Sequence, residues 1–209
     1  MKTATARLTR ARYLAALAAS LCWIVSGSSH GQTASPESIA EMLRDGGYVL
    51  VMRHASSPRE VPNQRARNPR NTEGERQLDE TGRAHATAVG YSFRALGIEI
   101  GEVLSSPAFR AAETLLYLGY EDAEAVEQLA PGNENAAWLR EKAAERPAEG
   151  MNLLIVTHAP NIAAAFGDAA SGMSDGETLV VRPGGDAAQV VGRMTVEDWA
   201  KQAVDRSGS

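Results

Sequence analysis

The sequence predicts an α/β domain of the three-layer α/β/α sandwich class, with a mostly parallel central sheet. The segments Tyr48–Met52 and Asn152–Thr157 are predicted to be strands buried on both faces, because their apolar residues run without alternation. Helical patterns alternate with such strands along the chain, which favours a parallel sheet covered on both sides. The 209 residues, 44% hydrophobic and 22% charged, suit one ordinary globular domain.

The first half of this domain shows clear start and stop signals. Ser35–Pro36 places a capping residue before a proline at the first helical position, and Gly46–Gly47 ends that helix. A strand follows over Tyr48–Arg53. The polar stretch 55–80 is too long for a simple connection, so we interpret it as a functional loop. The next helix is predicted over Thr81–Gly97.

The second half continues the alternation of strands and helices. The two last strands are joined by a turn through Pro183–Asp186. The predicted elements, in chain order, are a strand over Glu102–Ser105, a helix over Pro107–Leu118, a weaker strand near Ala125–Leu129, a helix over Asn135–Arg146, the strand Asn152–Thr157, a helix running to Gly172, and strands over Thr178–Arg182 and Gln189–Arg193.

The first 34 residues have the composition of a secretory signal peptide. Met1–Arg12 contains four basic residues and no acidic one, and an apolar run of about 13 residues follows at Tyr13–Val25. We expect cleavage within 27–34, which would leave residues 35–209 as one mature domain in the periplasm or outside the cell. The run is shorter than the roughly 17 to 25 residues of a spanning helix. The alternative is an uncleaved N-terminal segment that anchors the protein.

Charge and cysteine content exclude several classes of function. The chain has 21 Lys and Arg against 26 Asp and Glu. Loss of the signal peptide would leave 17 against 26, a formal charge of −9. An acidic domain is poorly suited to a nucleic acid as its main partner. The only cysteine, Cys22, lies in the signal peptide, so a disulfide and a cysteine nucleophile are not expected in the mature domain.

Charged and polar residues occur where three predicted strands end. Arg53 and His54 end one strand, Ser105 ends another just before the helix that carries Arg110, and His158 follows a third. In open parallel sheets, ligands bind at the carboxyl ends of the strands. We therefore expect two arginines and two histidines to meet at one edge of the sheet.

This set of side chains is suited to a small phosphorylated ligand. Guanidinium groups are permanently charged forks that match phosphate oxygens, and the Ser105 hydroxyl adds a donor. A histidine whose other ring nitrogen is held by a backbone carbonyl can attack phosphorus directly, with no metal. A second histidine, His158, kept protonated by the incoming phosphoryl charge, would stabilise the transition state.

Two other chemistries fit the sequence poorly. The histidines lack the i, i+4 helical spacing of common zinc motifs, so no metal site is predicted. Ser105 and Ser106 lack the G-x-S-x-G turn of many serine hydrolases.

The same residues resemble a known family. In order, they read Val51-Met52-Arg53-His54, Ser105-Ser106-Pro107-x-x-Arg110-Ala-x-Glu-Thr114 and Val156-Thr157-His158. This series is similar to that of the histidine phosphatase superfamily, the phosphoglycerate mutase-like group, over about residues 47–182. The segment Arg76–Arg83 resembles the one that opens the next helix in small bacterial members, including phosphohistidine phosphatases.

The resemblance implies a phosphoglycerate mutase-like fold and a catalytic mechanism without a cofactor. It implies His54 as the phosphorylated nucleophile and Arg53, Arg110 and His158 as the phosphate pocket. One departure is Ala55, where the family usually has glycine after the Arg-His pair.

The general acid that protonates the leaving oxygen is left open between two carboxylates. Glu134 is favoured by its position after Arg110, and Glu177, just before a predicted strand, is the alternative. Arg59 and Arg65, in the loop 55–80, are predicted to line the mouth of the pocket and to attract an anionic substrate. The alternative for this loop is a solvated segment whose arginines are offset by nearby glutamates.

The predicted function is an exported, metal-independent phosphatase that hydrolyses a phosphomonoester or a related phosphoryl compound. The alternative is a catalytically weak or inactive phosphate-binding accessory protein of the cell envelope. A mutase is disfavoured, because the sugar phosphates that mutases shuttle are cytoplasmic.

Overall fold

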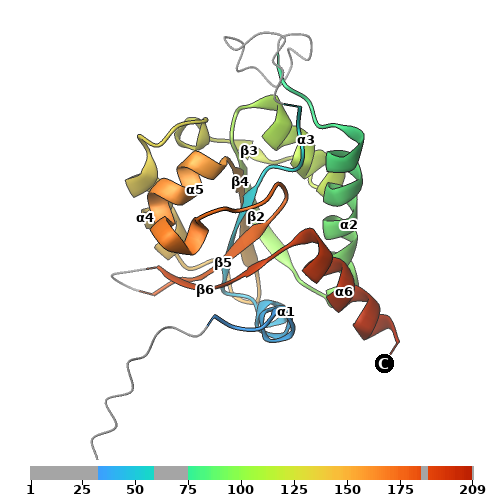
Figure 1. Ribbon diagram of the computed structural model, residues 1–209. Helices are drawn as coiled ribbons and strands as arrows, with labels where there is room; N and C mark the ends of the chain where they lie inside the picture. Colours follow the sequence, from blue (N-terminus) through green and yellow to red (C-terminus); the bar gives the residue numbers. More distant parts are fainter. Residues whose placement is uncertain (1–32, 59–74, 185–187, 209) are drawn as a thin grey trace, which may run out of the picture. The chain divides into compact units, whose positions relative to one another are not determined.

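The computed structural model describes residues 33–58, 75–184 and 188–208, and the chain from Thr33 onward groups into one compact unit (Figure 1). The predicted signal peptide and most of the loop 55–80 lie outside the described residues. No helix in the described ranges is long and apolar enough to cross a membrane.

The described chain alternates strands and helices. The strands are β1 (Val49–Arg53), β2 (Ile100–Ser105), β3 (Glu124–Ala125), β4 (Asn152–Thr157), β5 (Thr178–Arg182) and β6 (Gln189–Met194). The α-helices are α1 (Pro36–Arg44), α2 (Glu80–Leu96), α3 (Phe109–Leu118), α4 (Ala136–Ala144), α5 (Ala159–Phe166) and α6 (Val196–Ser207). Two short 3-10 helices, η1 (Glu127–Leu129) and η2 (Gly167–Ala170), complete the described elements.

The strands form one six-stranded sheet in the order β3-β2-β4-β1-β5-β6. The pairs β2–β3, β2–β4 and β1–β4 are parallel, whereas β5 pairs antiparallel with both β1 and β6. Within this sheet, β5 therefore runs against the other five strands. The predicted mostly parallel sheet is confirmed.

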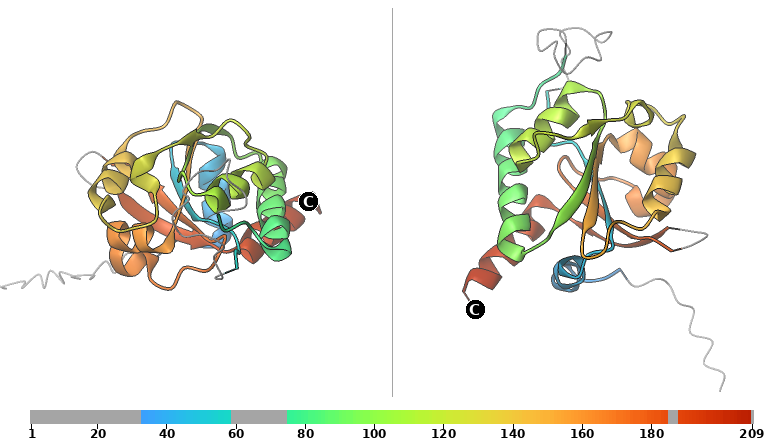
Figure 2. Two further views of the ribbon diagram at one scale, coloured as in Figure 1. Left: turned by 90° about the horizontal axis from the view of Figure 1, so that it is seen from above. Right: turned by 180° about the vertical axis from the view of Figure 1, so that it is seen from behind.

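Helices cover both faces of the sheet, as the buried strands require. Helices α1, α2, α3 and α6 pack on one face, and α4 and α5 on the other (Figure 2). Alternate residues of β1 enter the two cores, Leu50 and Met52 on the α2 side and Val49 and Val51 on the α5 side, and none of them is exposed. The three-layer α/β/α prediction is confirmed.

A glycine makes the entry into β1 possible. Gly46, just after α1, has φ of 75°, and a Cβ atom there would lie 2.4 Å from the carbonyl carbon of Gly150. Both the left-handed backbone and the close approach require a residue without a side chain. The Gly46–Gly47 stop signal thus ends α1 and also lets the chain pass against the loop before β4.

Two predicted elements differ from the structure, and one helix was not predicted. The weak strand near Ala125–Leu129 is a two-residue edge strand, β3, followed by η1, because its exposed residues pair only with the end of β2. The helix predicted to reach Gly172 is α5 and then η2, separated at Gly167. Helix α6 was not predicted, although a capping box at Thr195 and Asp198 starts it.

Candidate active site

The carboxyl ends of three neighbouring strands meet at one edge of the sheet. Strand β4 lies between β1 and β2, and the registers place Arg53 beside Thr157 and Ser105 beside Val156. The next residues stay in register, because the His54 N–H donates to the Thr157 carbonyl at 3.0 Å and the Ser106 N–H to the Val156 carbonyl at 2.9 Å. This edge carries the predicted site residues.

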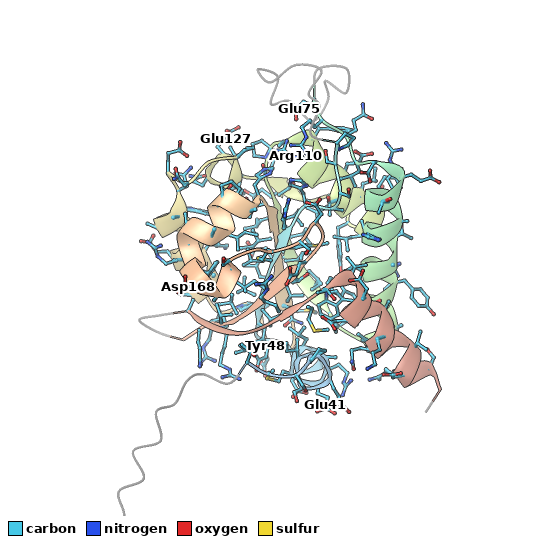
Figure 3. The ribbon with its side chains drawn as sticks, viewed as in Figure 1. Glu41, Tyr48, Glu75, Arg110, Glu127 and Asp168 are labelled. Carbon is cyan, nitrogen blue, oxygen red and sulfur yellow. The ribbon has the colours of Figure 1, made fainter. Side chains whose placement is uncertain are left out.

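A cavity of about 440 Å³ opens at this edge. In Figure 3 the label of Arg110 stands at this end of the molecule, and that of Tyr48 at the opposite end. The structure brings all four residues of the predicted phosphate site into the cavity. It is lined by Arg53, His54, Ser57, Arg76, Arg110, Pro131, His158, Ala159, Pro160 and Asp175.

Hydrogen bonds fix the proton of His54 on one ring nitrogen. Its Nδ1 lies 2.8 Å from the Ala55 carbonyl oxygen, which can only accept, so Nδ1 carries the proton. Its Nε2 accepts a hydrogen bond from the Nε of Arg110 at 3.1 Å. Burial, together with the charges of Arg110, Arg53 and Arg76, lowers the pKa of His54 from 6.5 to about 3, although the hydrogen bond to the Ala55 carbonyl raises it. His54 is therefore a neutral imidazole whose Nε2 lone pair is held by Arg110.

His158 has the opposite tautomer. Its Nδ1 lies 3.1 Å from Nη2 of Arg110, which can only donate, so the proton is on Nε2 and points to the Ser106 hydroxyl at 2.8 Å. The two rings meet edge to face, with their centres 5.1 Å apart. The predicted protonated His158 refers to the site with a phosphoryl group bound and stays a prediction. In the site without ligand, Arg110 supplies the positive charge beside both imidazoles.

Helix α3 places Arg110 and also supports the backbone next to His54. Thr114, one turn after Arg110, accepts the Ala55 N–H at 3.0 Å through its hydroxyl, which itself donates to the Arg110 carbonyl. The N-cap residue of α3 has no side-chain cap, and the buried carboxylate of Glu75 accepts the Phe109 N–H instead, at 2.8 Å. The Arg-Ala-x-Glu-Thr motif thus positions the backbone on which His54 stands.

The segment before α2 brings a third arginine into the cavity. Arg76 donates to the Ser57 carbonyl at 2.8 Å, and Glu113 of α3 holds the segment by accepting the Leu78 N–H at 2.6 Å. Arg83 of α2 pairs with the same carboxylate at 3.0 Å. The sequence analysis did not predict Arg76 as a site residue, because its position in the sequence alone did not show that it folds back over the strand ends.

Arg53 is held by the loop that precedes β5. Its guanidinium donates to the Met173 carbonyl and forms an ion pair with Asp175 at 2.6 Å, while its buried Nε has no hydrogen-bond partner. A buried donor without a partner costs free energy unless a ligand accepts from it. This N–H is therefore a ready donor for an anionic ligand in the cavity.

Comparison with solved structures finds this arrangement of strands and helices in phosphatases. The protein histidine phosphatase SixA, solved with tungstate, aligns with a TM-score of 0.57 at 19% identity, over 72% of this chain and 98% of SixA. A SixA-type protein of Agrobacterium tumefaciens gives 0.51 at 19% identity, over 71% and 98%. A mycobacterial glucosyl-3-phosphoglycerate phosphatase in complex with VO3 gives 0.50 at 15% identity, over 69% and 97%. The chain has the histidine phosphatase fold. No family model and no curated protein matches the sequence.

Within this histidine phosphatase fold, three predicted site residues lie apart from the cavity. Ser105 is buried, and its hydroxyl donates to the carbonyl of Ser106, the serine that contacts His158. Glu134 is exposed and its carboxylate accepts the N–H of its neighbour Asn133 at 3.0 Å. Glu177 is buried and its carboxylate is paired with Arg193. Arg59 and Arg65 lie outside the described residues.

Ala55 stands where the resemblance leads us to expect glycine, and it fits the packing beside His54. Its methyl group is completely buried in the core beneath α2 and α3. Its N–H donates to Thr114 and its carbonyl accepts from His54, so both backbone groups take part in positioning His54. The substitution therefore fits the packing around His54.

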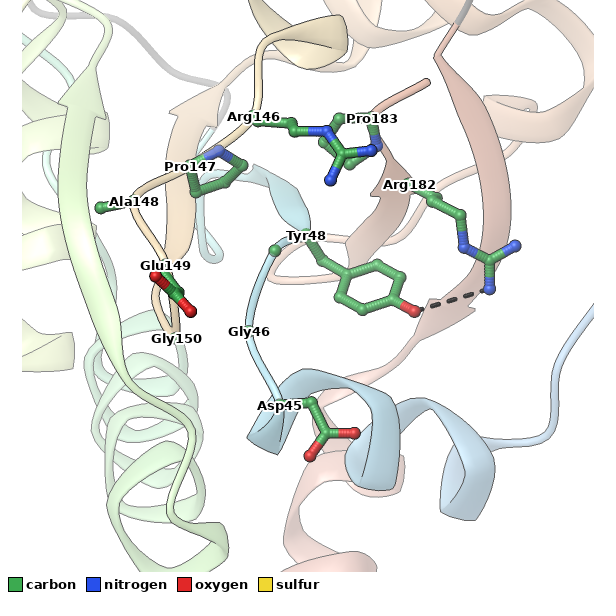
Figure 4. A pocket seen from close by; sticks show the side chains of 11 residues that line it. Asp45, Gly46, Tyr48, Arg146, Pro147, Ala148, Glu149, Gly150, Arg182 and Pro183 are labelled. Atoms are coloured by element: carbon green, nitrogen blue, oxygen red, sulfur yellow. Dashed lines mark hydrogen bonds between the residues drawn. The ribbon is translucent and has the colours of Figure 1, made fainter. Parts of the chain in front are cut away.

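A second cavity, of about 540 Å³, opens at the other end of β1 (Figure 4). It contains exposed groups of both signs, with Arg146 and Arg182 opposite Asp45 and Glu149. Arg182 lies over the Tyr48 ring, 5.7 Å from its centre. Because these charges are solvated and mixed in sign, the cavity at the carboxyl edge is the better candidate for the active site. No cluster of His, Cys, Asp and Glu suited to a metal ion occurs in the described ranges.

Proposed function

We propose that this protein is a phosphatase that transfers the phosphoryl group of a small phosphorylated compound first to His54 and then to water. The observation that carries the proposal is the bonding of His54. Its Nδ1 proton is held by a backbone carbonyl, and its Nε2 lone pair faces a cavity that contains three guanidinium groups. A neutral, oriented imidazole beside cationic forks is what an attack on phosphorus requires.

The arginines supply the charge for this reaction. Arg110 releases Nε2 of His54 when a phosphoryl group arrives, because the phosphoryl oxygens then accept its N–H groups. Arg53 offers its unpartnered Nε, and Arg76 reaches the same cavity. Once Arg110 no longer donates to its Nδ1, His158 can take up a proton from solvent there and so become a further donor to the phosphoryl oxygens. Charge-assisted hydrogen bonds of this kind are about twice as strong as neutral ones.

The neighbours support the class of ligand. SixA was solved with tungstate and the mycobacterial phosphatase with VO3, and both are oxyanions that resemble phosphate. We therefore propose a small phosphomonoester, or a phosphohistidine in a partner protein, as the substrate class.

The experiment is hydrolysis of p-nitrophenyl phosphate by residues 35–209 in EDTA, from pH 4 to pH 8, beside His54→Ala. We expect turnover that survives EDTA and is lost in the variant, together with a phosphorylated protein that is stable in base and labile in acid. Equal turnover in both proteins would contradict the proposal.

The second candidate is a phosphate-binding accessory protein with weak or no turnover. It is favoured by one observation, that neither Glu134 nor Glu177 lines the cavity. Vanadate binding that depends on His54, without turnover of any phosphomonoester tested, would support this candidate.

We also propose that the protein acts outside the cytoplasm, on the basis of its first 34 residues. The expected result is a mature N-terminus within residues 27–35 in the periplasmic or secreted fraction. An intact N-terminus in the membrane fraction would support the anchored alternative.

A further inference from the structure

One carboxylate of the described chain lines the candidate active site, and neither sequence pattern nor family resemblance pointed to it. It is Asp175, in the loop between η2 and β5. Strand β5 runs antiparallel to β1, so its beginning, at Thr178, lies at the sheet edge where β1 ends. A residue three positions before β5 therefore reaches the cavity that His54 lines.

The loop that carries Asp175 is fixed to the strand that carries His54. The Arg53 N–H donates to the Glu177 carbonyl at 3.0 Å, and the Gly176 N–H donates to the His54 carbonyl at 3.2 Å. Inside the loop, the Glu177 carboxylate accepts the Ser174 N–H at 2.7 Å and binds Arg193. Glu177 thus holds the loop in shape, and the carboxylate presented to the cavity is that of Asp175.

The ion pair with Arg53 places Asp175 beside the phosphate site. The two groups lie 2.6 Å apart, and both line the cavity. A phosphoryl group that binds Arg53 would therefore lie next to the Asp175 carboxyl group.

We propose that Asp175 is the general acid and base of the reaction, a proposal that rests on the phosphatase function proposed above. In the first step, the Nε2 lone pair of His54 forms the N–P bond as the P–O bond to the leaving group breaks. The leaving oxygen takes that electron pair and the proton of Asp175. In the second step, Asp175 takes a proton from water while the water oxygen bonds phosphorus. The N–P bond breaks, its electron pair returns to Nε2, and phosphate and protonated Asp175 result.

The other carboxylates near this edge bind groups outside the cavity. Glu75 is buried, but one of its oxygens accepts the Phe109 N–H and the residue does not line the cavity. Glu113 binds the Leu78 N–H and Arg83. The Glu134 carboxylate accepts the N–H of Asn133 in its own loop. Asp175 is the carboxylate of the described chain that can meet a leaving group.

The test compares two substrates in Asp175→Asn, which keeps the size of the side chain and removes the proton. An alkyl phosphate, glycerol 2-phosphate, has an alkoxide leaving group that needs a proton, whereas p-nitrophenolate leaves without one. We expect kcat/KM for the alkyl phosphate to fall about 100-fold or more, the usual contribution of a general acid. We expect kcat/KM for p-nitrophenyl phosphate to change by less than about fivefold.

The second step provides an independent readout with the same variant. Without a base, hydrolysis of the phosphohistidine slows, so p-nitrophenyl phosphate gives a burst of about one p-nitrophenolate per enzyme before a slow steady state. Glu134→Gln is the matched control and leaves the ratio of the two substrates as in the parent protein.

Three outcomes overturn the proposal. They are an equal loss for both substrates, which makes Asp175 only an anchor for Arg53; no loss for either substrate; and a selective loss in Glu134→Gln instead. Failure of the phosphatase function itself is a separate result, because the parent protein would then turn over neither substrate in a manner that depends on His54.

Discussion

The neutral state of His54 links the active site to the pH dependence of stability. Folding lowers the pKa of His54 from 6.5 to about 3, mainly through burial, and the side chain is 6% exposed. The folded protein therefore binds this proton more weakly than the unfolded chain does. Above pH 6.5 neither state binds this proton, so His54 does not lower the stability of the fold. As the pH falls from 6.5 toward 3, the free energy of unfolding decreases, because the unfolded chain binds the proton and the folded protein does not.

The size of the effect at pH 5 follows from the two pKa values. At that pH the unfolded chain has bound the proton and the folded protein has not. Between pH 6.5 and pH 5 the free energy of unfolding therefore decreases by about 2 kcal/mol, at 1.36 kcal/mol per pH unit. At pH 7.5 the loss of stability caused by His54 is close to zero.

The assay is urea unfolding at pH 7.5 and pH 5.0 of the parent protein and of His54→Gln, whose amide does not titrate. Between the two pH values, the parent should lose about 2 kcal/mol more than the variant. The buffers must be free of phosphate, since a ligand that binds only the folded state raises its apparent stability. Parallel losses in both proteins would refute the reasoning and would mean that His54 titrates normally in the fold.

Three further substitutions test hydrogen bonds and helix packing in the fold and beside the site. Asn152 is buried and its amide bonds three backbone groups, so Asn152→Ala should cost about 3 kcal/mol in urea unfolding, and a cost below about 1 kcal/mol would count against these bonds. Thr114→Val leaves the Ala55 N–H without its acceptor; we expect a loss of about 1–3 kcal/mol in thermal unfolding and a lower kcat on p-nitrophenyl phosphate, and an unchanged kcat would separate Thr114 from the nucleophile. A Cβ atom at Gly90 would lie 2.1 Å from the Leu118 carbonyl oxygen, so Gly90→Ala should push α2 from α3 and cost about 1–3 kcal/mol in urea unfolding, whereas a neutral result would show that the helices adjust freely.

The parts of the fold that could be predicted are those where burial dictates composition. Strands β1 and β4 are covered on both faces, so nearly every position must be apolar, and the apolar run ends where the chain reaches the cavity, at Arg53 and His158. The sequence therefore located the strand ends and, through them, the four residues that meet in the cavity.

Helix α6 was missed although its signals were present. Thr195 and Asp198 form a capping box, and the buried residues Val196, Trp199 and Ala203 follow at helical spacing. Trp199 packs edge to face on Phe93 of α2, 4.9 Å between ring centres. The position of α6 on the sheet, by contrast, depends on this tertiary contact.

The sequence could not show that Asp175 is the carboxylate that lines the cavity. Whether the residues before or after a strand reach the active edge depends on the direction of the strand, and the direction of β5 is set by its pairing with β1. Nothing in Thr178–Arg182 itself distinguishes a parallel from an antiparallel strand. Glu177 and Asp175 are two residues apart, yet one closes a loop and the other faces the cavity.

The complementary tautomers of the two histidines give the protein an internal spectroscopic reporter. The Nδ1 proton of His54 and the Nε2 proton of His158 are each held by a buried acceptor, the Ala55 carbonyl and the Ser106 hydroxyl. Such protons exchange slowly with solvent and give separate proton resonances far downfield of the amide region. Since Arg110 touches the opposite nitrogen of both rings, an oxyanion that draws it away would shift both resonances together. Binding could then be followed by NMR with any ligand, including those that are never turned over.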